Sequence, residues 1–342
     1  MSATQRLLLL NSNGNKPHRH APEIMELGRF ANASSKAYSR SQPGHHLCCI
    51  GGGIEMQNHA YASRQFALSL ASFLSTIILT IGTLFGVSSA ANAQQTTASS
   101  EKIWEDLKGD VFGDRAILID TGVVRIEAPK RAQDAAIVPV DIYVDPARAP
   151  DGIKSVTLII DANPAPVAAT FQIGKDAGVT HLSTRVRVND YSYLRAIAET
   201  QGGQLHMAQT FVKASGGCSA PAVKNQDEAM ATMGQMKLRQ FPPQETMSKA
   251  EELQLMIRHP NNSGLQRDPL TQYFIPAHFV QKLSISQAGR PILSMEGGIS
   301  ISEDPNFRFD FTAHGNGEIQ VEAIDTDGKV FRNQWPLEKT GL

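Results

Sequence analysis

Hydrophobic and polar positions alternate in short runs along the chain from about residue 115 onward. A period of two places the apolar side chains on one face of a β-strand. Gly, Asn, Asp and Pro separate the runs, as is typical of turns between antiparallel strands. In the first half of the chain the pattern predicts strands at residues 116–119, 123–126, 137–144, 156–160, 182–188 and 205–214.

The same alternation returns in the second half. Here it predicts strands at residues 253–257, 278–285, 291–295, 307–311, 318–324 and 330–335. Phe307, Phe309 and Phe311 alternate with Arg308 and Asp310, which predicts one buried and one solvated face. Short strands at this spacing, with turn residues between them, favour a small antiparallel β-sandwich in each half.

The segment between the halves has a different composition. Residues 221–249 are rich in Gln, Met and Pro, and we interpret them as a partly helical linker between domains at 94–220 and 250–342. Met230, Met233 and Met236 recur at a helical spacing and predict a helix over residues 227–239, which Pro242 and Pro243 would end. A second short helix is predicted over residues 101–107.

An apolar stretch near the start indicates export. It follows Arg64, extends from residue 66 to 87 and ends in Ala91-Asn92-Ala93, so residues 56–93 have the parts of a cleavable signal peptide. Because a signal peptide begins near the start of its protein, Met56 is the expected initiator and residues 1–55 a mis-called extension. The alternative is a membrane anchor, since about 20 apolar residues can span a bilayer.

Composition narrows the class of function. The 342 residues are 41% hydrophobic and 19% charged, which is typical of globular chains, and the net charge of -1 argues against a nucleic-acid-binding protein. The sequence contains no GxGxxG, P-loop or GxSxG motif. The histidines after the signal peptide lack metal-ligand spacing, so we expect no metal and no cofactor; they are His181, His206, His259, His278 and His314.

Candidate chemistry is concentrated at one cysteine. Cleavage would remove Cys48 and Cys49, leaving Cys218 as the single thiol, in the run Gly216-Gly217-Cys218. The glycines and the lack of apolar alternation predict a flexible, exposed arm, with the sulfur held up to roughly 15 Å from the preceding strand. No His, Asp or Glu is close in sequence, which argues against a nucleophile with its own base.

Several segments together resemble a known family. In the first half they are Glu127-Ala128-Pro129, Val138-Pro139-Val140, residues 163–166 and 169–171, residues 183–187, and Val212-Lys213 leading to Gly216-Gly217-Cys218. In the second half they are residues 259–264, 275–279 and 300–305. This set resembles the SoxYZ sulfur-compound carriers, and most closely the fused form called the quinoprotein dehydrogenase-associated SoxYZ-like carrier.

The resemblance implies two immunoglobulin-like β-sandwiches in contact, in a periplasmic protein. It implies that Cys218 carries a small, sulfur-containing intermediate as a covalent adduct, and that Gly216 and Gly217 give its arm flexibility. The implied partners are Sox-type enzymes, or a quinoprotein dehydrogenase and a cytochrome, and the cargo of the fused form need not be sulfur. In SoxY the motif Gly-Gly-Cys-Gly ends the chain, whereas here Ser219 follows and the chain continues.

Three functions remain in competition. The leading hypothesis is a non-catalytic periplasmic carrier, with no membrane contact after signal cleavage. The second is an interaction module that docks a quinoprotein dehydrogenase or cytochrome and uses Cys218 only for assembly, including a disulfide-linked dimer. The third is a thiol-dependent enzyme, which the lack of a second cysteine or an adjacent base disfavours.

Overall fold

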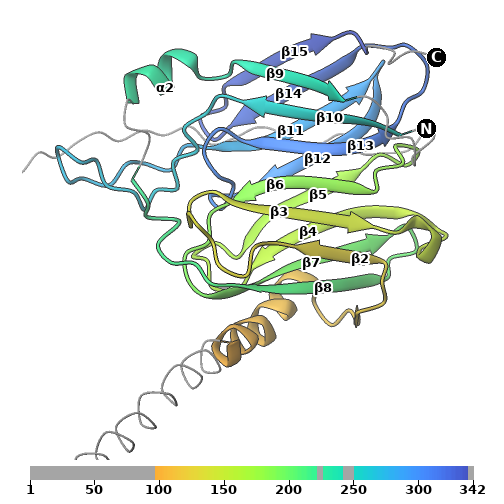
Figure 1. Ribbon diagram of the computed structural model, residues 1–342, viewed down its shortest axis with the longest axis horizontal. Coiled ribbons are helices and arrows are strands. Elements are labelled where there is room, and N and C mark those ends of the chain that lie inside the picture. The colour runs from red at the N-terminus through yellow and green to blue at the C-terminus, as the bar shows by residue number, and fades with distance from the viewer. Residues whose placement is uncertain (1–96, 222–225, 242–249, 338–342) are drawn as a thin grey trace, which may run out of the picture. The chain divides into compact units, whose positions relative to one another are not determined.

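Two β-sheets make up most of the structure, and each contains strands from both halves of the sequence (Figure 1). The computed structural model describes residues 97–221, 226–241 and 250–337. The predicted signal peptide and the 1–55 extension lie outside these residues. In spatial order the nine-stranded sheet contains β1 (Ile117–Ile119), β8 (Leu205–Val212), β7 (Ser192–Thr200), β4 (Ile153–Ile160), β5 (Val167–Ile173), β12 (Arg290–Gly297), β11 (Val280–Gln287), β14 (Ile319–Asp325) and β15 (Val330–Trp335).

The second sheet has six strands. Their spatial order is β2 (Val124–Glu127), β3 (Val138–Val144), β6 (His181–Val186), β13 (Asn306–Thr312), β10 (Ala250–Ile257) and β9 (Met236–Phe241). The helical elements with described ends are a 3-10 turn, η1 (Pro146–Arg148), and α2 (Gln226–Thr232). No helix within the described ranges is long and apolar enough to cross a membrane.

The halves meet by direct strand pairing. In the nine-stranded sheet β5 pairs antiparallel with β12, from Ile173 opposite Leu293 to Ala169 opposite Gly297. In the other sheet β6 pairs with β13. The all-β fold is therefore confirmed. The contact that the family resemblance implies between the two halves takes the form of continuous sheets, and these pairings cover edges that two separate sheets would leave exposed.

One apolar core extends through both halves. It contains strand residues from β2 to β8 and from β10 to β15. Phe307, Phe309 and Phe311 on β13 are fully buried, as the alternation predicted. Asp310, predicted to face water, is buried too, because its carboxylate accepts hydrogen bonds from the backbone N–H groups of Thr180 and His181. It thereby fixes the start of β6.

A helix covers the other face of β4, β7 and β8. The chain is helical from residue 97, where the description begins, to residue 112, which includes the predicted helix at 101–107. Trp104 packs there in a second apolar cluster with Ile159 and Ile197. Arg195 lies buried beneath the helix, 2.8 Å from Asp161 and with its guanidinium 4.7 Å from the Trp104 ring centre.

The predicted linker contains a strand. The helix predicted over residues 227–239 ends at Thr232, and β9 follows and pairs antiparallel with β10. The helix prediction is therefore wrong for its second part. Pro242 and Pro243 lie outside the described residues. Two further strands, β5 and β7, occur where no strand was predicted.

Candidate functional site

Cys218 is buried, not displayed on an arm. Its exposed fraction is 0%, and the prediction of an exposed thiol roughly 15 Å from the sheet is therefore wrong. Cys218 is the one free cysteine among the described residues, and it belongs to neither apolar cluster. It lies in a turn after β8, at the place where the two halves of the sequence meet.

The glycines allow this segment to pack closely. The Gly216 N–H donates to Asn189 O at 2.8 Å, and the Gly217 N–H donates to Val188 O at 3.1 Å. A Cβ on Gly217 would lie 2.1 Å from the carbonyl oxygen of Ala135, so only glycine fits there. Gly216 adopts a φ of 75°, in the left-handed region, but has open space around it. Their structural role is close approach and a tight turn, whereas arm flexibility stays a prediction.

A buried arginine lies beside the cysteine segment. Arg187 is 1% exposed and donates from Nη1 to Gly217 O at 3.3 Å and from Nη2 to Asn261 O at 3.4 Å. Its Nε has no hydrogen-bond partner, and no carboxylate of the described chain lies within ion-pair distance of it, although the charges of Glu303 and Asp134 act on it from further away. A buried charge without a paired anion is costly, so Arg187 is poised to stabilise negative charge in its surroundings.

Segments from both halves hold this arginine and cysteine. Asn163 donates from Nδ2 to Arg187 O at 2.7 Å and to Ser300 Oγ at 2.8 Å, which joins the first half to the second. The Arg187 N–H donates to Ser300 O at 2.7 Å. The Ser263 hydroxyl donates to the carbonyl of Cys218. Four of the segments that carried the family resemblance, at residues 163–166, 183–187, 259–264 and 300–305, therefore meet around Arg187 and the Cys218 turn.

Electrostatics keep the thiol protonated. Burial raises the pKa of Cys218 to about 11, and the positive charge of Arg187 offsets only part of that effect. Burial likewise lowers the pKa of Arg187, while Glu303 and Cys218 oppose that shift. Because the thiolate is the nucleophile, Cys218 in this position is a weak one. The site can store a thiol or its adduct away from water, but it lacks the activation expected of a catalytic cysteine.

A second polar cluster was missed by the sequence analysis. His259, His278 and Asp325 each offer a ligand-type atom, and these atoms lie within 4.8 Å of one another. They follow β10, precede β11 and end β14, so no local spacing in the sequence marks them. Burial lowers the pKa of His259 to about 4, so its imidazole is neutral at pH 7.

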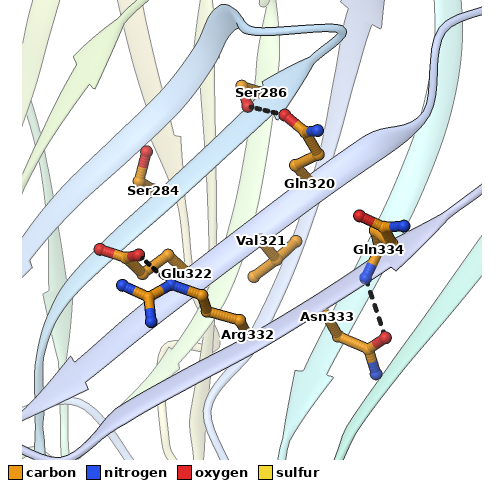
Figure 2. Close-up of a pocket in the computed structure, with 8 residues that line it drawn as sticks. All are labelled: Ser284, Ser286, Gln320, Val321, Glu322, Arg332, Asn333 and Gln334. Carbon is orange, nitrogen blue, oxygen red and sulfur yellow. Dashed lines mark hydrogen bonds and ion pairs between the residues drawn. The ribbon is translucent and has the colours of Figure 1, made fainter.

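A surface hollow lies elsewhere on the molecule. It has a volume of about 610 Å³ and lies over β11, β14 and β15 (Figure 2). Its charged groups already pair, since Arg332 Nε lies 2.6 Å from Glu322. Ser286 and Gln320 likewise bond to each other, at 3.5 Å. The residues that line the hollow include no activated nucleophile and no unpaired charge, and we assign no chemistry to it.

Comparison with known proteins matches both halves to families. Residues 108–218 match the family of the sulfur oxidation protein SoxY, a match that ends on Cys218, and residues 239–336 match that of the sulphur oxidation protein SoxZ. No curated protein matches.

Two solved structures show distant similarity to this chain. A superoxide reductase (neelaredoxin) from Ignicoccus hospitalis shares 15% identity, over 28% of this chain and 93% of its own, with a TM-score of 0.25. A β-glycosidase from Bacteroides vulgatus shares 10% identity, over 64% of this chain and 25% of its own, with a TM-score of 0.20. At these scores neither similarity carries an argument about function.

Proposed function

We propose that this chain, a SoxY-like domain fused to a SoxZ-like domain, is a carrier of the sulfur-oxidation type. In this proposal the protein is not a catalyst, and its cargo is held covalently on Cys218. The observation that supports this most is the convergence of both domains on one cysteine. The Ser263 hydroxyl reaches the Cys218 carbonyl from the second domain, while Arg187 reaches Gly217 from the first.

Burial gives the carrier a closed state. A group attached to a buried sulfur is protected from water and from stray thiols, which suits a reactive adduct such as a persulfide or thiosulfonate. Loading then requires the turn at Gly216–Ser219 to open, because an enzyme cannot reach a thiol with no exposed surface. The hydrogen bonds from Gly216 and Gly217 to the preceding loop are the contacts that opening must break.

Arg187 supports a negatively charged adduct. A thiolate or an oxidised sulfur adduct on Cys218 would bring an anion to a guanidinium that has none as a partner in the described structure. The partners we propose are Sox-type enzymes, or a quinoprotein dehydrogenase with its cytochrome. Both fit the periplasmic location that we propose from the predicted signal peptide of residues 56–93.

The burial of Cys218 also fits a second candidate function. A single cysteine that is buried and protonated can be a structural residue of an interaction module that docks a quinoprotein dehydrogenase or cytochrome. In that function Cys218 would contribute only to assembly of the protein with its partner or with a second copy. A disulfide-linked dimer would require the turn around Cys218 to open only occasionally.

Replacement of Cys218 in the native host separates the two. The test compares thiosulfate and alcohol oxidation by cells that contain the wild-type protein, Cys218→Ser or Cys218→Ala, with equal protein levels checked on a blot. A carrier loses the supported oxidation in both variants, because neither can hold the adduct. Full activity in both variants would contradict the carrier. A dimer that disappears in both would then support the interaction module.

A further inference from the structure

We propose that His259, His278 and Asp325 form a binding site for a divalent transition metal of the zinc class, with Asp327 as the ligand nearest solvent. The site lies in the SoxZ-like domain and is separate from Cys218. Two imidazole nitrogens with carboxylate oxygens suit Zn²⁺ or a similar first-row ion, whereas Ca²⁺ and Mg²⁺ prefer oxygen ligands alone.

The distances fit a metal ion. His278 Nε2 lies 2.9 Å from Asp325 Oδ2 and 3.3 Å from Asp327 Oδ2, and His259 Nε2 lies 3.7 Å from Asp325 Oδ2. Tetrahedral ligands of zinc, at bond lengths near 2.0–2.2 Å, are about 3.3 Å apart. The observed separations lie on both sides of that value, so small side-chain movements complete the geometry.

An unpartnered buried nitrogen points to a missing ligand. His259 is 1% exposed, and its Nε2 has no hydrogen-bond partner although it faces Asp325. A buried polar atom without a partner is rare in folded proteins and calls for an explanation. Asp325 is buried as well, and within the described chain its carboxylate has no Lys or Arg side chain as a partner. A cation between them would satisfy both groups.

The surrounding backbone holds the ligands in place. Asp325 Oδ1 accepts the N–H groups of Asp327 at 3.0 Å and Lys329 at 2.8 Å, which orients the carboxylate. Its Oδ2 faces the imidazoles and bonds to His278 Nε2 at 2.9 Å, a contact that a metal ion would replace. His278 is fixed through its backbone, which exchanges two hydrogen bonds with Asn262. The site is therefore built on strand ends and not on side chains alone.

Two contacts oppose binding and have to change, and the first is the 2.9 Å hydrogen bond between His278 Nε2 and Asp325 Oδ2. The Asn261 N–H donates to His259 Nδ1 at 3.1 Å, which places the proton of the neutral ring on Nε2. Coordination at Nε2 displaces that proton to Nδ1, so the Asn261 N–H must turn to another acceptor. The loss is these two hydrogen bonds, against new bonds from the metal to as many as four ligands. We therefore expect binding, with a local shift at Asn261.

Cobalt binding tests the site without any carrier activity. The full-length protein with Cys48, Cys49 and Cys218 all replaced by serine, which removes every thiol as a competing ligand, is stripped with a chelator and titrated with Co²⁺, then with Zn²⁺ by calorimetry. We expect one equivalent of Co²⁺ with the intense visible absorption of a four-coordinate ion, displaced by Zn²⁺. His278→Asn should weaken binding at least 100-fold, and Asp327→Asn about tenfold.

The control is His314→Asn, which changes an exposed histidine outside the cluster and should leave the affinity unchanged. Circular dichroism checks the fold of each variant. If His278→Asn does not fold, the exposed Asp327→Asn decides. No saturable binding in the cysteine-free protein, or an affinity that His278→Asn or Asp327→Asn leaves unchanged, overturns the proposal. Because Cys218 is absent throughout, failure here leaves the carrier hypothesis untouched.

Discussion

Substitution of Gly217 by alanine should open the turn that buries Cys218. The new Cβ would lie 2.1 Å from Ala135 O and 2.6 Å from Val188 O, and both are backbone atoms that cannot rotate away. Real Cβ atoms do not approach within 3.0 Å, so the turn has to move by about an ångström or leave its place. The Gly217 hydrogen bond to Val188 is lost, and Cys218 becomes accessible.

The size of the effect follows from the thiol's pKa. At pH 8 a thiol with a pKa of about 11 is roughly 0.1% thiolate, whereas one at the ordinary value of 9.0 is roughly 10% thiolate. Opening should therefore speed alkylation by about 100-fold from ionisation alone, and access to solvent adds to that. The assay is the rate of Cys218 modification by a small thiol reagent at pH 8, in folded protein.

Gly216→Ala is the matched control. Gly216 has a φ of 75°, so alanine there costs about 1–2 kcal/mol in backbone strain. Its Cβ would meet only the Ser219 hydroxyl, at 3.8 Å, so the turn can stay closed. We expect lower overall stability but slow labelling. If folded Gly217→Ala protein is labelled as slowly as the wild type, the reasoning about close packing is refuted.

Three further predictions follow from the same structure. Arg187→Met should speed the reductive release of a thiosulfonate adduct from Cys218 at least tenfold, because the guanidinium no longer stabilises the adduct's negative charge. The adduct is made with tetrathionate: the Cys218 thiolate attacks the central disulfide and thiosulfate leaves. Intact mass then follows loss of the adduct in reductant, and an unchanged rate would count against Arg187 as the counter-ion. Because folding raises the pKa of Cys218 to about 11, the free energy of unfolding should fall as pH rises from about 9 to 11, by at most ~2.7 kcal/mol. Urea unfolding measures this loss, and Cys218→Ser protein should not show it. Trp104→Ala should cost about 3–5 kcal/mol and release the 97–112 helix to proteolysis, so resistance equal to the wild type would contradict its anchoring role.

Alternation predicted most strands that have one buried and one exposed face, and it missed β7, where side chains on both faces are buried. In β7, Leu194 and Ala196 pack in the main core, while Ile197 on the other face packs against the helix at residues 97–112. Apolar residues therefore occur on both faces, and hydrophobicity does not alternate along the strand. In β9 the period of two is present, because Met236 and Leu238 pack toward the core. The helical spacing of three methionines concealed it.

The burial of Cys218 could not be read from its neighbours in sequence. The residues that pack against its turn come from remote segments and include Ala135, Arg187 and Ser263. A run of small residues is compatible with exposure and equally with close approach of two backbones, and only the fold decides between them. Several of the family segments were nevertheless informative, because they meet around Arg187 and the Cys218 turn.

The state of Cys218 in the cell tests the carrier hypothesis most directly. The protein is purified from its native host without reductant, and its intact mass is measured, followed by fragmentation to locate any added mass. We predict a population with a small adduct, such as a persulfide or thiosulfonate, on Cys218, released by reductant and absent from Cys218→Ser protein. Native protein that carries only the free thiol, under conditions in which the host is oxidising its substrate, would contradict the hypothesis.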